Sequence, residues 1–199
     1  MVAETQEKTR NDHMQETKEP TDEKLMLALS EGHLDSAAAL FERYHKRIFN
    51  FFLRLTGGRR DLSEDLCQNV FERIIRYRAS YREGKAFRPW IYQIARNLHY
   101  DQAGGTSLHR DDFAELSEVE SREQSASRQL EKSEERAQLY RAISCLESHE
   151  REVLVLTRFQ ELKYREVAAI LGLTEGAVKV RVHRAIKNLK DQFYKLEQR

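Results

Sequence analysis

The stretch from Leu162 to Leu189 constrains the fold most strongly, because it has the pattern of two short helices joined by a tight turn. The first helix carries three apolar residues on one face: Val167, Ala168 and Leu171. Gly172 follows, at a point where a residue with left-handed backbone geometry ends a helix at little steric cost. Thr174 is a favourable N-cap for the second helix, and the carboxylate of Glu175 suits the positive end of that helix.

The second predicted helix is both amphipathic and basic. Its apolar face carries Val178, Val182, Ala185 and Leu189, whereas its other faces carry Lys179, Arg181, His183, Arg184, Lys187 and Lys190. Between Thr174 and Lys190 there are five Lys or Arg residues against one acidic residue. A helix, a glycine-containing turn and a basic helix are together typical of a DNA-binding helix-turn-helix. The alternative is a surface helical hairpin whose basic face is only solvated.

The composition favours an all-α protein, since 199 residues include only 2 prolines and 8 glycines and show no useful strand alternation. The net charge of +1 is small for a nucleic-acid-binding protein, but local charge matters more than the sum. Cys67 and Cys145 lie in apolar helical contexts without metal-ligand spacing, so we expect buried, reduced thiols and no metal or cofactor. The absence of a signal peptide and of a long apolar run predicts a cytoplasmic protein without membrane insertion.

The order of these patterns along the chain predicts two small helical domains joined by a flexible linker. Residues 1–20 are polar and are expected to form a disordered tail. Residues 21–105 contain amphipathic helical stretches that end at two glycines, and they form the predicted first domain. Residues 106–127 are small, polar and acidic, as expected of a linker, and residues 128–199 form the domain that ends in the helix-turn-helix.

The helical periodicity fails over residues 79–88, where Tyr81 and Phe87 occur together with three basic residues. Aromatic and basic side chains in one loop suit stacking on unpaired bases and binding of phosphates. The alternative is an ordinary loop that buries its aromatic side chains, and the local sequence leaves both interpretations open.

Three stretches, in this order, carry a resemblance to a known family: DLSEDLCQNVFERI (Asp61 to Ile74), FRPWIYQIARNLHYD (Phe87 to Asp101) and YREVAAILGLTEGAVKVRVHRAIKNL (Tyr164 to Leu189). The chain resembles the extracytoplasmic-function sigma factors of bacterial RNA polymerase, which belong to the sigma-70 family. The resemblance covers residues 25–104 and 130–195 and leaves out the tail and the linker. It implies a sigma region 2-like domain that binds polymerase and melts the promoter, followed by a region 4-like domain that binds DNA.

The resemblance also implies where core RNA polymerase binds. The helix from Asp61 to Ile74 is similar to the family's docking helix for the clamp coiled coil of the largest polymerase subunit, and the polymerase flap is a further expected contact. The candidate polymerase contacts are the polar residues of this helix: Asp65, Gln68, Asn69, Glu72 and Arg73. We expect a few charged anchors among them to supply most of the binding energy.

Two sets of residues are candidates for promoter DNA. For melting and recognition of the start-proximal element they are Tyr81, Phe87, Arg88, Trp90, Arg96 and Asn97, with the aromatic loop as the wall of a pocket for an unpaired base. Trp90 is either a wedge at the melted junction or a core residue. For the upstream element in the major groove they are Gly176, Lys179, Val180, Arg181, His183, Arg184 and Lys187. Arg181 and Lys187 are the expected phosphate anchors within this set.

The sequence departs from the family pattern at several positions. Lys163 stands where the family often has a helix-capping serine, and Val180 stands where a small polar residue is common. The first domain lacks the basic cluster with which that of the family often ends, which predicts weak non-specific DNA affinity for it.

Other functions remain open at this level. A free-standing helix-turn-helix repressor or activator would bind duplex DNA alone, usually as a symmetric dimer. An enzyme is disfavoured, because the sequence lacks a glycine-rich phosphate loop, a metal-ligand cluster and a nucleophile motif. The resemblance also predicts an anti-sigma factor as an inhibitory partner that clamps the two domains together.

Overall fold

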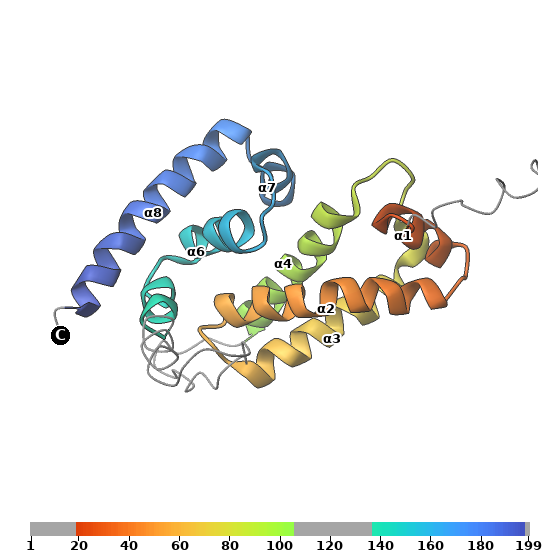
Figure 1. Cartoon of the computed structure of the whole chain (residues 1–199), viewed down its shortest axis with the longest axis horizontal. Helices are drawn as coiled ribbons and strands as arrows, with labels where there is room; N and C mark the ends of the chain where they lie inside the picture. The colour runs from red at the N-terminus through yellow and green to blue at the C-terminus, as the bar shows by residue number, and fades with distance from the viewer. Residues whose placement is uncertain (1–18, 106–136, 198–199) are drawn as a thin grey trace, which may run out of the picture.

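The computed structural model describes residues 19–105 and 137–197, and within these two ranges every regular element is helical. Figure 1 shows an N-terminal block that includes α1 to α4 beside a C-terminal block that includes α6 to α8. The all-α prediction is therefore confirmed. The predicted linker, residues 106–127, and nearly all of the predicted tail, residues 1–20, lie outside the described residues, and the predicted domain limits stay predictions.

The N-terminal block is built around a long central helix. Its elements are α1 (Asp22–Ser30), α2 (Asp35–Leu55), α3 (Arg60–Arg76), the 3-10 turn η1 (Arg78–Ser80) and α4 (Phe87–Gly105). The central helix α2 packs against α1, α3 and α4. It does so because its apolar residues recur every three or four positions, which places them on one continuous face.

Aromatic side chains fix the position of α4 on α2. The rings of Tyr44 and Phe87 lie 5.1 Å apart and those of Phe51 and Tyr92 lie 5.4 Å apart, both edge to face. All four side chains are buried. Edge-to-face pairs of this kind contribute about 0.5–1.5 kcal/mol beyond the area that they bury. These residues of α2 therefore help to orient α4, which also packs on α3.

The C-terminal block holds the helix-turn-helix on a hydrophobic floor. Its described elements are a helical segment over residues 137–144, α6 (Ser148–Leu154), the π-helical turn η2 (Val155–Phe159), α7 (Tyr164–Leu171) and α8 (Glu175–Glu197). At the end of η2 the Gln160 N–H donates to the carbonyl of Val155, five residues earlier, at 3.0 Å. This wide turn holds one more residue than an α-helical turn. Helix α8 packs on α6 and α7.

The turn between α7 and α8 has the geometry that the sequence predicts. Gly172 ends α7 with a left-handed φ of 64°, and the Leu173 N–H donates to the carbonyl of Ala168 at 2.9 Å. The Thr174 hydroxyl oxygen accepts a hydrogen bond from the Ala177 N–H at 3.2 Å, as expected of an N-cap. The predicted helix-turn-helix is therefore confirmed in its local chemistry.

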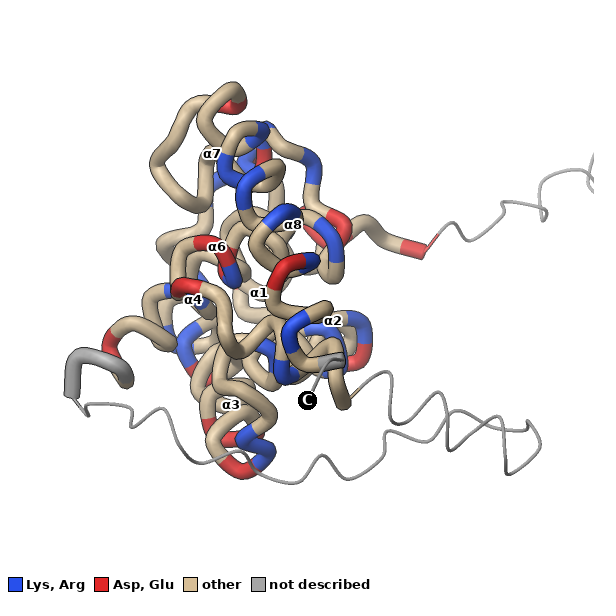
Figure 2. The backbone as a smooth tube through the Cα atoms, turned by 90° about the vertical axis from the view of Figure 1, so that its left-hand side faces the viewer, with Lys and Arg blue, Asp and Glu red and all other residues tan. Residues whose placement is uncertain are grey.

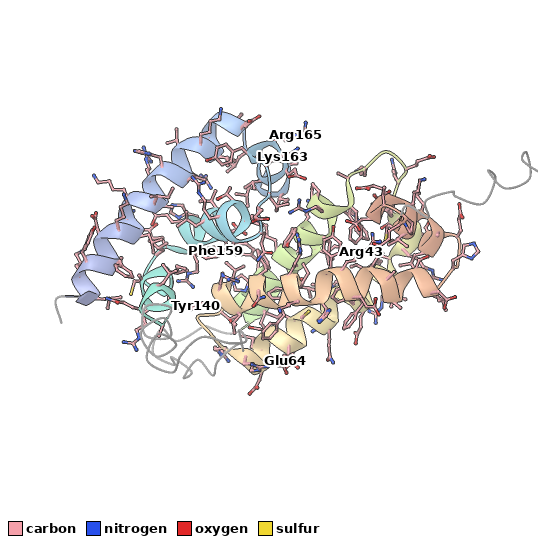
Figure 3. The ribbon with its side chains drawn as sticks, viewed as in Figure 1. Arg43, Glu64, Tyr140, Phe159, Lys163 and Arg165 are labelled. Atoms are coloured by element: carbon pink, nitrogen blue, oxygen red, sulfur yellow. The ribbon has the colours of Figure 1, made fainter. Side chains whose placement is uncertain are left out.

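The start of α7 is closed without the serine that the family often has there. The Glu166 carboxylate accepts a hydrogen bond from the Lys163 N–H at 2.7 Å, one half of the interaction known as a capping box. Lys163 itself is exposed and lies beside α7 (Figure 3). A carboxylate one turn along therefore satisfies the first backbone donor of the motif.

The two blocks pack against each other. Helix α4 contacts α7, and α2 contacts both α6 and η2. The buried apolar residues form one cluster that runs from Leu25 in α1 to Ala185 in α8. In Figure 1 α4 lies between α2 and the C-terminal block, so one face of α4 supports its own block while another meets the second block.

The two cysteines differ in their surroundings. Cys67 is buried, as predicted, and its Sγ donates to the carbonyl of His45 at 3.4 Å, but Cys145 is exposed. The prediction of a buried thiol at Cys145 was wrong, because this residue lies in the turn that follows the helical segment over residues 137–144, where its side chain is exposed. Among the described residues no group of three or more potential metal ligands comes together, and no helix is long and apolar enough to cross a membrane.

Candidate nucleic-acid interface

The outer face of α8 presents nearly all of the residues predicted to read the upstream promoter element. Six are exposed and one, Arg181, is half-buried; the exposed ones are Gly176, Lys179, Val180, His183, Arg184 and Lys187. The opposite face is held against the block by three buried residues: Val178, Val182 and Ala185. Figure 2 shows Lys and Arg positions recurring along α7 and α8. The helix is therefore fixed on one side and free to meet a ligand on the other.

A concavity of about 300 Å³ lies between the start of α6 and the middle of α8. It is lined by His149, Glu150, Arg181 and Arg184. The Glu150 carboxylate accepts a hydrogen bond from the Asn188 side chain at 2.6 Å, which ties α6 to α8. His149 was not among the predicted residues, because nothing in the sequence shows that its helix lies beside α8.

The polar face of α3 is free over most of its length. Asp65, Gln68, Asn69 and Glu72 are exposed, at positions that follow one another on a single helical face. Arg73 is half-buried, and its guanidinium donates to the Asp101 carboxylate of α4 at 3.2 Å. The structure therefore brings the predicted polymerase contacts together, with Arg73 also linking α3 to α4.

A stripe of four residues on α4 meets the C-terminal block; we call Arg88, Tyr92, Arg96 and Tyr100 the α4 stripe. Its members are spaced four residues apart, so they follow one face of the helix. Arg88 donates to the backbone carbonyl of Gln160 at 2.8 Å, and the Tyr92 hydroxyl donates to the Gln160 side-chain carbonyl at 2.7 Å. The two basic residues predicted to bind the start-proximal element, Arg88 and Arg96, are thus turned toward the second block.

The lower half of the α4 stripe shares a single carboxylate. Arg96 Nε donates to Glu152 Oε1 at 2.8 Å, and the Tyr100 hydroxyl donates to Glu152 Oε2 at 3.2 Å. Burial raises the pKa of Glu152, and the charge of Arg96 acts in the opposite direction. Burial also raises the pKa of Tyr100, so its hydroxyl stays protonated and able to donate.

Two predicted pocket residues lie in the core instead. Tyr81 is 6% exposed and Phe87 is fully buried, with their rings 6.4 Å apart, and the Tyr81 hydroxyl donates to the backbone carbonyl of Lys85. The expectation that these rings form an open wall for an unpaired base was wrong. The loop instead buries its aromatic side chains, which is the alternative that the sequence left open. The apolar interior beneath α1 and α4 accounts for this, since both rings belong to its cluster.

The remaining predicted residues of this set divide between interior and surface. Trp90 is half-buried, with its ring 5.1 Å from that of Tyr81. Asn97 is exposed on α4. Glu152 and Gln160, the partners of the α4 stripe, could not be named from the sequence, because they are polar residues in the other block and only tertiary packing brings them to α4.

The comparisons with known proteins agree with this architecture. The model of the family "Sigma-70 region 2" matches residues 40–106, and that of "Sigma-70, region 4" matches residues 136–189. The RNA polymerase sigma factor CarQ of Myxococcus xanthus is 30% identical over 167 residues, which cover 84% of this chain and 94% of CarQ.

Two solved structures have a similar fold. CnrH, in complex with the cytosolic domain of CnrY, aligns with a TM-score of 0.63 and 24% identity over 85% of this chain and 95% of CnrH. The sigma factor RpoE, in complex with the anti-sigma factor NepR from Bartonella quintana, aligns with a TM-score of 0.61 and 22% identity. That alignment covers 79% of this chain and 96% of RpoE.

Two helical blocks, a confirmed helix-turn-helix and these matches define a transcription initiation factor rather than a catalyst. The chain belongs to the sigma-70 family of RNA polymerase sigma factors, in its extracytoplasmic-function group. It binds core RNA polymerase, directs the polymerase to specific promoters and helps to open the DNA. The alternative of a free-standing repressor or activator is thereby set aside.

Proposed function

We propose that α8 reads the upstream promoter element through its exposed face. The observation that carries this proposal is the outward position of Lys179, His183 and Arg184 on a helix whose other face is buried. Lys and Arg side chains donate to guanine edges in the major groove, and the exposed Val180 can contact a thymine methyl group. His149, beside Arg181 in the concavity, adds a donor for a neighbouring phosphate.

Transcription by purified core polymerase on a pool of host promoter DNA tests this assignment. The Arg184→Ala variant is expected to lower initiation by about tenfold at promoters that depend on the upstream element, as for loss of one base contact. The matched control is Lys195→Ala, which removes a cation from the same helix near its far end. Equal losses in the two variants would reject base reading by this face.

We also propose that the exposed face of α3 docks on core polymerase. Its support is the contiguous exposed set of Asp65, Gln68, Asn69 and Glu72 on one face of the helix. Asp65→Lys is expected to weaken binding to core polymerase at least tenfold, whereas Asp35→Lys, which changes an exposed acidic residue in the first turn of α2, serves as control. Equal binding of both variants would place the docking surface elsewhere.

We further infer that Arg88, Trp90, Arg96 and Asn97 of α4 engage the start-proximal element once the strands separate. Two guanidiniums and an amide on one helix provide donors for phosphates and base edges.

The protein acts in the cytoplasm, beside polymerase and promoter DNA. An anti-sigma factor is the expected inhibitor, because the related RpoE structure is a complex with one.

A further inference from the structure

The loop that leads into α4 is flanked by α1 at both of its ends. We call residues 82–86, which lie between the buried Tyr81 and Phe87, the tip loop; all of them are exposed. Helix α1 packs against η1, which precedes this loop, and against α4, which follows it. The Glu23 carboxylate of α1 accepts a hydrogen bond from the Phe87 N–H at 3.1 Å, across 64 positions of the chain. An acidic residue of α1 therefore contacts the residue at which α4 begins.

This hydrogen bond takes the place of a local helix cap. The first N–H groups of a helix have no partner within it, and a side chain just before the helix usually accepts from one of them. Ala86 stands there and offers no side-chain acceptor, and Pro89, in the first turn, has no N–H. The Glu23 carboxylate also places negative charge near the positive end of the α4 dipole. The start of α4 therefore depends on a residue of another helix.

The tip loop is closed from its other end by Tyr81. The Tyr81 hydroxyl donates to the backbone carbonyl of Lys85, and within the loop the Lys85 N–H donates to the carbonyl of Arg82 at 3.2 Å. Burial, aided by the charge of Glu23, raises the pKa of Tyr81 to about 12, so the hydroxyl stays protonated and able to donate. The two buried rings are therefore the anchors of an exposed and internally bonded loop.

Helix α1 is itself fixed on the central helix α2. Arg43 of α2, which lies close to α1 (Figure 3), donates to the Asp22 carboxylate at 2.9 Å and to the carbonyl of Pro20 at 2.8 Å. The Tyr44 hydroxyl donates to the same carboxylate, while the Tyr44 ring lies 5.1 Å from that of Phe87. The acceptor that caps α4 is therefore held in place by a framework that includes the start of α4.

We propose that Glu23 is a positioning residue for recognition of the start-proximal promoter element. By capping α4 it holds Arg88, Trp90 and the tip loop in place before DNA arrives, so less conformational entropy is lost when an unpaired strand binds. Without the cap only a fraction of the chains would hold this arrangement, and the apparent affinity would fall by that fraction. This inference rests on the proposed role of α4 in binding the start-proximal element.

The test uses holoenzyme, the complex of the full chain with core polymerase, and compares wild type with Glu23→Ala and Glu23→Gln. Glutamine keeps a carbonyl oxygen that can accept from the Phe87 N–H, whereas alanine does not. Glu31→Ala is the matched control, because it removes an exposed carboxylate from the other end of α1. A pool of single-stranded DNA of randomised sequence is sequenced before and after capture on each holoenzyme. Core polymerase alone gives the background.

Glu23→Ala should weaken capture of the sequences that the wild type prefers by roughly tenfold, the equivalent of one hydrogen bond to a charged acceptor, and should flatten the base preference. Glu23→Gln and the control should match the wild type. Binding to core polymerase, measured in parallel, should be the same for all variants, because the exposed face of α3 is unchanged. A purely structural role would instead lower core binding and would not be rescued by glutamine.

The outcomes separate this inference from the proposed function. A wild-type base preference that persists in Glu23→Ala would overturn the positioning role and leave the role of α4 intact, and equal losses in Glu23→Ala and Glu23→Gln would overturn the hydrogen bond as its cause. A wild-type holoenzyme with no preference beyond that of core polymerase would overturn the proposed function itself.

A second variant decides the case if circular dichroism shows that Glu23→Ala does not fold. Tyr81→Phe keeps the buried ring but removes the hydrogen bond to Lys85. It should also flatten the base preference while binding core polymerase normally. An unaltered preference in this variant would overturn the positioning of the tip loop.

Discussion

Arg96 of α4 and Glu152 of α6, which are 56 positions apart in the chain, form an ion pair at 2.8 Å. The Glu152 side chain is 6% exposed and that of Arg96 is 28% exposed, so the acid is nearly enclosed while the base keeps some contact with water. A pair of this kind falls between a surface salt bridge and a fully buried one. Removal of either residue alone would leave the charge of the other without its partner in an interface that is partly shielded from water.

The first prediction concerns the strength of this pair. A double-mutant cycle with Arg96→Ala and Glu152→Ala should give a coupling free energy of about 1–2 kcal/mol, between the values for exposed and buried pairs. The exposed pair Arg60–Glu64 should give no more than about 0.5 kcal/mol. Urea unfolding measures both cycles, and equal couplings would show that burial adds nothing to the interdomain pair.

The second prediction separates the two glycines of the helix-turn-helix. Gly172→Ala should destabilise the protein by about 1–2 kcal/mol, because an L-residue is strained at its φ of 64° although space is open around it. Gly176→Ala should stabilise by up to about 1 kcal/mol, since this glycine lies inside α8 and a methyl group there meets no atom within 4 Å. Urea unfolding measures the free energy of unfolding of the two variants. Effects of the same sign would contradict the different roles assigned to the two glycines.

The third prediction concerns the thiols. Burial raises the pKa of Cys67 to about 11, which leaves almost no thiolate near neutral pH, whereas Cys145 is exposed. Ellman's reagent should therefore modify one thiol per folded chain quickly and the second only after denaturation. A Cys145→Ser variant should lose the fast reaction. Fast labelling of that variant would show that the Cys67 site opens readily.

The fourth prediction is a pH dependence that arises from His99. Burial, aided by the charge of Arg151, lowers the pKa of His99 from 6.5 to about 4. Between these values the unfolded chain binds a proton that the folded chain does not, so stability falls as the pH falls through this window. The loss should reach about 2–3 kcal/mol near the lower end.

A His99→Gln variant isolates this contribution in urea unfolding at several pH values. The variant should lose less stability than the wild type on acidification. Glu152 acts in the opposite direction, since its raised pKa favours the folded, protonated form at low pH. Because Glu152 is present in both proteins, the difference between them reports His99 alone. Parallel curves for the two proteins would refute the assignment.

The sequence was sufficient for the helices and for the helix-turn-helix. Gly172 and Thr174 act locally, on backbone groups within a few residues, so their roles follow from chain order. The exposed face of α8 could also be predicted from the sequence, because helical periodicity separates Val178 and Val182 from the basic residues.

The packing of the two blocks could not be predicted in the same way. The contacts of Arg96 with Glu152 and of Tyr92 with Gln160 depend on tertiary packing, for which periodicity carries no signal. The burial of Tyr81 and Phe87 was left open for a related reason: an aromatic residue in a loop fits a nucleic-acid pocket or a core equally well. Cys145 shows the same limit, since the sequence does not show that the helix ends before this residue.

Because η2 is a π-helical turn, the number of residues in this segment matters more for the placement of Gln160, α7 and α8 than the identity of its side chains. Each residue of a helix advances the chain by about 100° of rotation. Deleting one residue from Val155–Phe159 would convert the wide turn to an ordinary α-helical one and keep the helix intact. Gln160 would then rotate away from α4, and α7 and α8 would be re-aimed with it. Insertions and deletions in η2 should therefore be tolerated far less than substitutions of its side chains.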